Sequence, residues 1–154
     1  MSYEVTKSIM CTASTAAVAT TAATALCGAI ENGSPAAPVN AISHIVWGET
    51  AALRDGVSAK YTASGAVLNS AAMLPWAALH HLLFQPHTRR ARPAEALARG
   101  AVTASIAYVV DYYVVPSRLT PGFEKRLSNV SLFAIYAALA CALATGDRMA
   151  QERG

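Results

Sequence analysis

Four long stretches of the chain lack the regularly spaced charges that a soluble helix carries on its outer face. These stretches are residues 9–30, 61–84, 96–115 and 127–145. The exceptions are one basic residue, Arg99, and one acidic residue, Asp111, both in the third stretch. A helix of about 20 apolar residues crosses the hydrocarbon core of a bilayer, and strands are not indicated because no period-two alternation occurs. The pattern therefore predicts an all-α fold, an integral membrane four-helix bundle that forms one domain over residues 1–154.

The first stretch carries small residues at every fourth position. They are Ala13, Ala17, Thr21 and Ala25. Small side chains on one helical face let neighbouring backbones approach closely inside a membrane. We therefore expect this helix to pack against the other spans.

The long connection between the first two stretches contains a further helical pattern. Pro38 is a helix start signal and Gly48 a stop signal. An apolar face runs from Val39 to Val46. The pattern predicts a short amphipathic helix over residues 38–47, which either lies at the membrane interface or dips back into the protein.

Composition agrees with a membrane protein but does not decide the matter. Hydrophobic residues make up 54% and charged residues 14% of the chain, against about 25% charged in soluble domains. Much of the apolar content is Ala, so a soluble Ala-rich helical bundle is the alternative. The net charge of +3 is too small to indicate nucleic-acid binding. The three cysteines show no CxxC spacing, so neither a disulfide framework nor a zinc site is expected.

Basic residues are most concentrated between the second and third stretches. This cluster consists of Arg89, Arg90, Arg92 and Arg99. Short loops rich in Lys and Arg stay on the cytoplasmic side, so we expect both termini in the cytoplasm. The same arginines could bind anionic lipid headgroups, although their effect on topology is enough to explain them.

Two segments carry a resemblance to known proteins. They are "NAISHIVWGE" after the first stretch and "YVVDYYVVPSRLTPGFEKRLS" around the end of the third. In these segments the chain resembles a group of small proteobacterial inner-membrane proteins that have no assigned activity. The resemblance implies a bacterial inner (plasma) membrane location and transfers no mechanism.

Seven residues are expected to gather at the membrane end opposite the termini. They are His44, Trp47, Glu49, Asn69, Asp111, Tyr112 and Arg118. Polar groups in a bilayer need partners, so we read this set as a hydrogen-bonded clamp that holds the short helix on the bundle. A ligand site built from the same residues is the alternative. Asp111 itself is read as a structural carboxylate bonded to a tyrosine or to Arg118, and otherwise as part of a proton or cation relay.

Two adjacent histidines, His80 and His81, lie near the cytoplasmic end of the second stretch. They are weak metal candidates, since upright helices would separate His80 from Asp111 by on the order of 15 Å. We expect an interhelical hydrogen bond or an interfacial anchor there. A haem shared across a two-fold dimer is the alternative. No cofactor is predicted.

No sequence motif points to a reaction. The chain lacks a nucleophile elbow, a P-loop, an HExxH motif and a Rossmann glycine pattern, so no catalytic residue is predicted. We expect a non-enzymatic structural, accessory or scaffold subunit that forms a homo-oligomer or joins a larger membrane complex. The first alternative is a small oligomeric transporter or channel that uses Asp111, Asn69 and His44. The second is a histidine-based haem or redox subunit.

Overall fold

The computed structural model describes residues 3–84 and 91–152, with side chains up to residue 150. Its α-helices are α1 (Tyr3–Asn32), α2 (Ala37–Ile42), α3 (His44–Trp47), α4 (Tyr61–Phe84), α5 (Pro93–Val109) and α6 (Asn129–Glu152). Four short turns complete the described chain: η1 (Glu49–Leu53), η2 (Val110–Val114), η3 (Ser117–Leu119) and η4 (Phe123–Lys125). Since the described residues contain no strand, the all-α prediction is confirmed for them.

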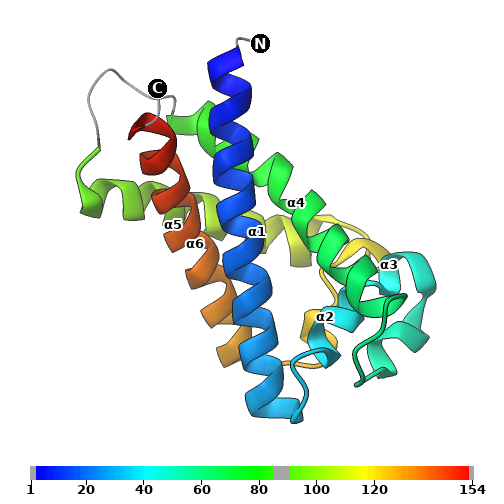
Figure 1. Cartoon of the computed structure of the whole chain (residues 1–154). Helices are drawn as coiled ribbons and strands as arrows, with labels where there is room; N and C mark the ends of the chain where they lie inside the picture. The colour runs from blue at the N-terminus through cyan, green and yellow to red at the C-terminus, as the bar shows by residue number, and fades with distance from the viewer. Residues whose placement is uncertain (1–2, 85–90, 153–154) are drawn as a thin grey trace.

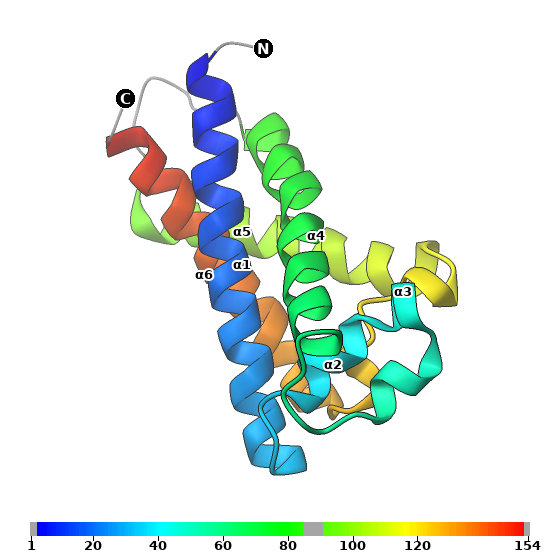
Figure 2. The ribbon, with the colours of Figure 1, turned by 45° about the vertical axis from the view of Figure 1, so that its right-hand side comes forward.

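Helix α1 lies between α4 and α6 and contacts both (Figures 1 and 2). Helices α4 and α6 run in one direction and α1 runs in the other, so α1 begins at the same end of the molecule at which α6 ends (Figure 1). The connections after α1 and before α6 form a cap at the opposite end.

Close packing between α1 and α6 depends on small residues. A Cβ atom added to Gly146 would lie 2.7 Å from the Cα atom of Thr12, so the two backbones are nearly in contact. Of the small residues predicted to face other helices, Ala13 and Ala17 are buried. The small side chains thus allow a helix distance that larger residues would prevent.

The third predicted span does not run alongside the others. Residues 96–115 fall in α5 and the π-helical turn η2, and α5 runs across the direction of α1 and α6 (Figures 1 and 2). It passes close to α6 where a Cβ atom on Gly100 would lie 2.2 Å from the carbonyl oxygen of Ala140.

Three helices in the described chain are long and apolar enough to cross a membrane. They are Tyr3–Asn32, Tyr61–Phe84 and Asn129–Ala150. These ranges overlap the first, second and fourth predicted stretches. A span over residues 96–115 remains a prediction, because α5 does not meet the same test of length and hydropathy.

The predicted helix over residues 38–47 forms two shorter helices. Every residue of α2 is buried, whereas Val46 in α3 is 52% exposed, so these helices do not present one continuous apolar face to an interface. Asn40 explains the position of α2, because its amide donates to the carbonyl oxygens of Arg54 (2.8 Å) and Gly56 (2.9 Å). The buried helix α2 thus lies inside the protein, while α3 is partly exposed.

Apolar side chains cover the outside of the long helices, and polar side chains lie inside. Val18, Val67 and Phe133 are 71%, 67% and 77% exposed. Asn69 and His80 are buried, as are several threonines. This distribution is the reverse of the one that water favours, in which charged and polar groups cover the surface.

Candidate functional site

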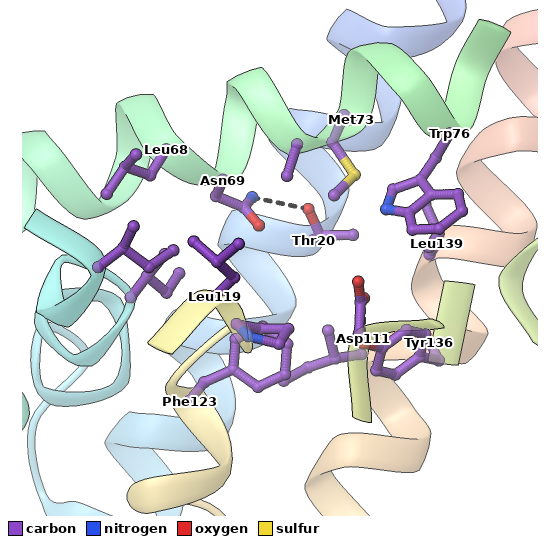
Figure 3. Close-up of a pocket in the computed structure, with 15 residues that line it drawn as sticks. Thr20, Leu68, Asn69, Met73, Trp76, Asp111, Leu119, Phe123, Tyr136 and Leu139 are labelled. Carbon is purple, nitrogen blue, oxygen red and sulfur yellow. Dashed lines mark hydrogen bonds between the residues drawn. The ribbon is translucent and has the colours of Figure 1, made fainter. Parts of the chain in front are cut away.

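Asn69 and Asp111 line one cavity of about 80 Å³ in the interior (Figure 3). Its wall comes from α1, α2, α3, α4, α6, η2 and the segment from η3 to η4, and most of it is apolar. Met73 and Trp76 contribute to the wall from α4 and Phe123 from η4. Asn69 and Asp111 were both expected at the membrane end opposite the termini, and they line the same cavity.

Asn69 connects α4 to α1. Its amide nitrogen donates to the hydroxyl oxygens of Thr20 at 2.9 Å and Thr21 at 3.0 Å. The Thr20 hydroxyl in turn donates to the carbonyl oxygen of Ala16 at 2.8 Å. Both amide hydrogens are therefore satisfied by α1, and the bond to Thr20 is visible in Figure 3.

Asp111 connects η2 to α6. The hydroxyl of Tyr136 donates to Oδ2 of Asp111 at 2.6 Å, a length typical of a bond to a carboxylate. The wide π turn closes through a bond of 3.0 Å from the amide of Val115 to the carbonyl oxygen of Val110. The Asp111 carboxylate points into the cavity (Figure 3).

Three tyrosines pack around the Asp111 contact. The ring centroids of Tyr108 and Tyr136 lie 5.3 Å apart with an interplanar angle of 89°. Those of Tyr112 and Tyr136 lie 6.1 Å apart. Tyr112 is thus part of this aromatic cluster, and edge-to-face contacts of this kind add stability beyond the area that they bury.

His44, Glu49 and Arg118 line a second pocket of about 260 Å³, together with Ser117 and Lys125. His44 is buried, with Nδ1 at 2.9 Å from the carbonyl oxygen of Ala41. Because a carbonyl only accepts, Nδ1 carries the hydrogen and Nε2 is an acceptor; Nε2 has no partner among the described residues. Glu49 accepts from Nζ of Lys125 at 2.6 Å. That bond lowers the pKa of Glu49 below its usual range.

Trp47 belongs to neither pocket. Its indole nitrogen donates to the hydroxyl of Ser64 at 3.1 Å, and Nζ of Lys60 lies 4.4 Å from the ring centroid. A cation over an aromatic face is a favourable contact at the protein surface. The seven predicted residues are therefore divided between an inner cavity, a pocket in the cap and two local contacts.

His80 is buried between α4 and α5, and its Nδ1 lies 2.9 Å from the hydroxyl oxygen of Thr103. His81 is only half-buried. Within residues 3–84 and 91–152, no group of three or more His, Cys, Asp or Glu side chains could hold a metal ion.

Two arginines of the predicted basic cluster are described, and Arg89 and Arg90 lie outside the described residues. Arg92 is exposed just before α5. Arg99 pairs with Glu95 and lies over the ring of Phe84, 5.8 Å from its centroid.

Sequence reasoning missed the contacts that join the ends of α1 and α6. Glu31 accepts hydrogen bonds from the amide (2.7 Å) and hydroxyl (2.6 Å) of Ser128 and from the hydroxyl of Ser131. It also missed Tyr136 as the partner of Asp111. A signal for Tyr136 was present, since its hydroxyl lies in an otherwise apolar stretch and needs a partner there.

Comparison of the chain with known protein families, with curated proteins and with solved structures gives no match.

Proposed function

We propose that this chain is a small multi-span protein of the bacterial inner membrane with a non-enzymatic role, as a structural, accessory or scaffold subunit. One observation carries the proposal: the three longest helices expose apolar side chains on their outer surface, and the polar residues Asn69, Asp111 and His80 each meet a partner on another element. Such a surface is stable in lipid, where it displaces no water, and is costly in water.

The outer surface supports membrane insertion. In the most apolar 18-residue segment of each helix, 22% of α4 is buried, against 39% of α1 and 50% of α6. A soluble bundle of this size would instead bury its apolar faces, because the burial of apolar area is the main force that folds it. The lipid bilayer is accordingly the first partner that we propose.

The interior supports a structural role. Asn69 joins α4 to α1, Asp111 joins η2 to α6, and His80 contacts Thr103 of α5. Each of these side chains meets a partner on another element. Hydrogen bonds of this kind hold helices together inside a bilayer, so the polar residues act as clamps.

Extraction of membranes with alkaline carbonate tests the location. We expect the chain to stay in the pellet, since carbonate removes peripheral proteins and leaves spanning helices in lipid. A tag after residue 154 and a tag before residue 1 should both be digested by protease only from the cytoplasmic side. Release of the chain into the supernatant would contradict membrane insertion, and digestion of the two tags from opposite sides would contradict the proposed topology.

Transport is the second candidate, and the cavity shared by Asn69 and Asp111 is the observation that favours it. About 80 Å³ holds a few water molecules, and an ionisable residue on such a cavity is a feature of ion paths. The scaffold proposal expects no proton or sodium flux in proteoliposomes. A flux in the wild type that Asp111→Asn abolishes, with the fold retained, would favour the transporter instead.

A further inference from the structure

An apolar groove follows the face between α5 and α6. Its volume is about 770 Å³. Ala104, Leu132 and Ala140 are buried and form its floor, while Tyr108 and Phe133 are 38% and 77% exposed and form its rim. None of the described helices covers this face of α6 beyond the crossing with α5 (Figures 1 and 2).

The groove continues into a smaller pocket that has a basic end. This pocket measures about 190 Å³ and shares Leu97 and Cys141 with the groove. Arg148 of α6 lines its far end. Arg148 is half-buried and makes no ion pair with any residue that the structure describes. An occupant of the whole cleft therefore meets apolar walls first and a guanidinium last.

We propose that this cleft binds an anionic phospholipid, with one acyl chain in the groove and the phosphate at Arg148. Binding rests on the proposed membrane location. The cleft follows α6 for 19 residues from Arg148 to Asn129, a rise of about 28 Å. The dimensions fit, because its part from Arg148 to Ala137 rises by about 16 Å. That is close to half of the roughly 30 Å hydrocarbon core, so a headgroup at Arg148 places its chain along the groove within one leaflet.

The charge at the end of the cleft distinguishes a lipid from a partner helix. Arginine binds phosphate oxygens through two parallel hydrogen bonds, and Arg92 is exposed next to Pro93, which also lines the basic pocket. The apolar part of a helix from a second copy of this chain would fill the groove but brings no anion of its own to Arg148. A molecule with a long apolar part and one anionic end satisfies both parts of the cleft.

Small side chains keep the groove open. Ala101 and Ser105 line it from α5, and Ala137 and Cys141 line it from α6; all four are exposed. Leucine at Ala101 and Ala137 would occupy the space of an acyl chain and leave Arg148 unchanged. The two halves of the cleft can therefore be perturbed separately.

Native mass spectrometry of the detergent-purified protein tests this inference. Phosphatidylglycerol and phosphatidylcholine with identical chains are the lipid probes, and inorganic phosphate is a separate arm. We expect phosphatidylglycerol to be retained in preference, and Arg148→Gln to reduce its retention by about tenfold, as the loss of a charged hydrogen bond implies. Arg54→Gln, at an exposed arginine of the cap, should change nothing. Ala101→Leu with Ala137→Leu should reduce retention of both lipids.

Several results would overturn the inference. They are an unchanged lipid preference in Arg148→Gln, binding of inorganic phosphate as tight as that of the lipid, and loss of a dimer in the groove-filled variant without loss of lipid. Circular dichroism checks the fold of each variant, and Arg148→Lys, which keeps the charge, should keep part of the preference. Carbonate extraction of the wild type separates the two proposals: a chain that stays in the membrane but shows no lipid preference contradicts the lipid site alone.

Discussion

The bond between Tyr136 and Asp111 should stabilise the fold by a measurable amount. Tyr136→Phe removes only the hydroxyl that donates to the carboxylate at 2.6 Å and leaves the ring in its aromatic contacts. Hydrogen bonds to charged groups contribute about 1.5–3 kcal/mol in soluble proteins. Interhelical bonds in membranes average about 0.6 kcal/mol and reach about 1.7 kcal/mol. We therefore expect Tyr136→Phe to lower the free energy of unfolding by about 1–2 kcal/mol.

A double-mutant cycle isolates the bond from other effects of each substitution. Tyr136→Phe, Asp111→Ala and the double variant are unfolded in detergent micelles and followed by circular dichroism. We expect a coupling energy of about 1 kcal/mol, because the second substitution removes a bond that the first has already broken. Tyr113→Phe is the matched control, since Tyr113 is 74% exposed. Additive single effects, within about 0.3 kcal/mol, would refute the clamp at Asp111.

Three further predictions concern other contacts. Lys125 lowers the pKa of Glu49 below its ordinary value of 4.5, so this pair stabilises the fold above that pH and stops doing so as the pH falls through the lower native pKa. A melting curve of Glu49→Gln against pH should accordingly lose this acid-dependent part, and an identical pH profile would contradict it. Asn69→Leu removes two bonds to α1 and should cost about 1 kcal/mol in the same unfolding assay; a variant as stable as the wild type would show that these bonds do not stabilise the fold. Gly146→Ala places a Cβ atom 2.7 Å from a Cα atom of α1 and should lower the free energy of unfolding by about 1–3 kcal/mol. In the control Gly56→Ala the added Cβ atom meets nothing within 4 Å, so stability should change by less than about 0.5 kcal/mol. Equal effects of the two substitutions would contradict the close approach of α1 and α6.

The three longest helices could be predicted because each follows an uncharged stretch that a hydropathy pattern detects directly. The stretch over residues 61–84 has the same bounds as α4. The direction of α5 could not be predicted in this way, since hydropathy measures length and composition but not orientation. The direction of α5 depends on its packing against α6, including the close approach of Gly100 to Ala140, and these residues are far apart in the sequence.

The end of the bundle at which the candidate residues lie was predictable, but their hydrogen-bond partners were not. The order of the predicted spans put Asn69 and Asp111 at the same end of the membrane, and both line the inner cavity. The partner Tyr136 depends on how α6 is rotated about its axis, which no single sequence reveals. His44 and Glu49 lie in a separate pocket of the cap, and the predicted continuous helix divides at Ser43.

The central claim is that lipid covers the exposed apolar face of the long helices. Cys141 tests it most directly, since it is exposed on α6 and lines the groove. After Cys11 and Cys27 are replaced by serine, broken membranes are treated with a charged maleimide before and after detergent is added. Lipid cover predicts that Cys141 stays unlabelled in membranes while an added Arg118→Cys is labelled. Rapid labelling of Cys141 in membranes would show that this face is in water and would contradict the account.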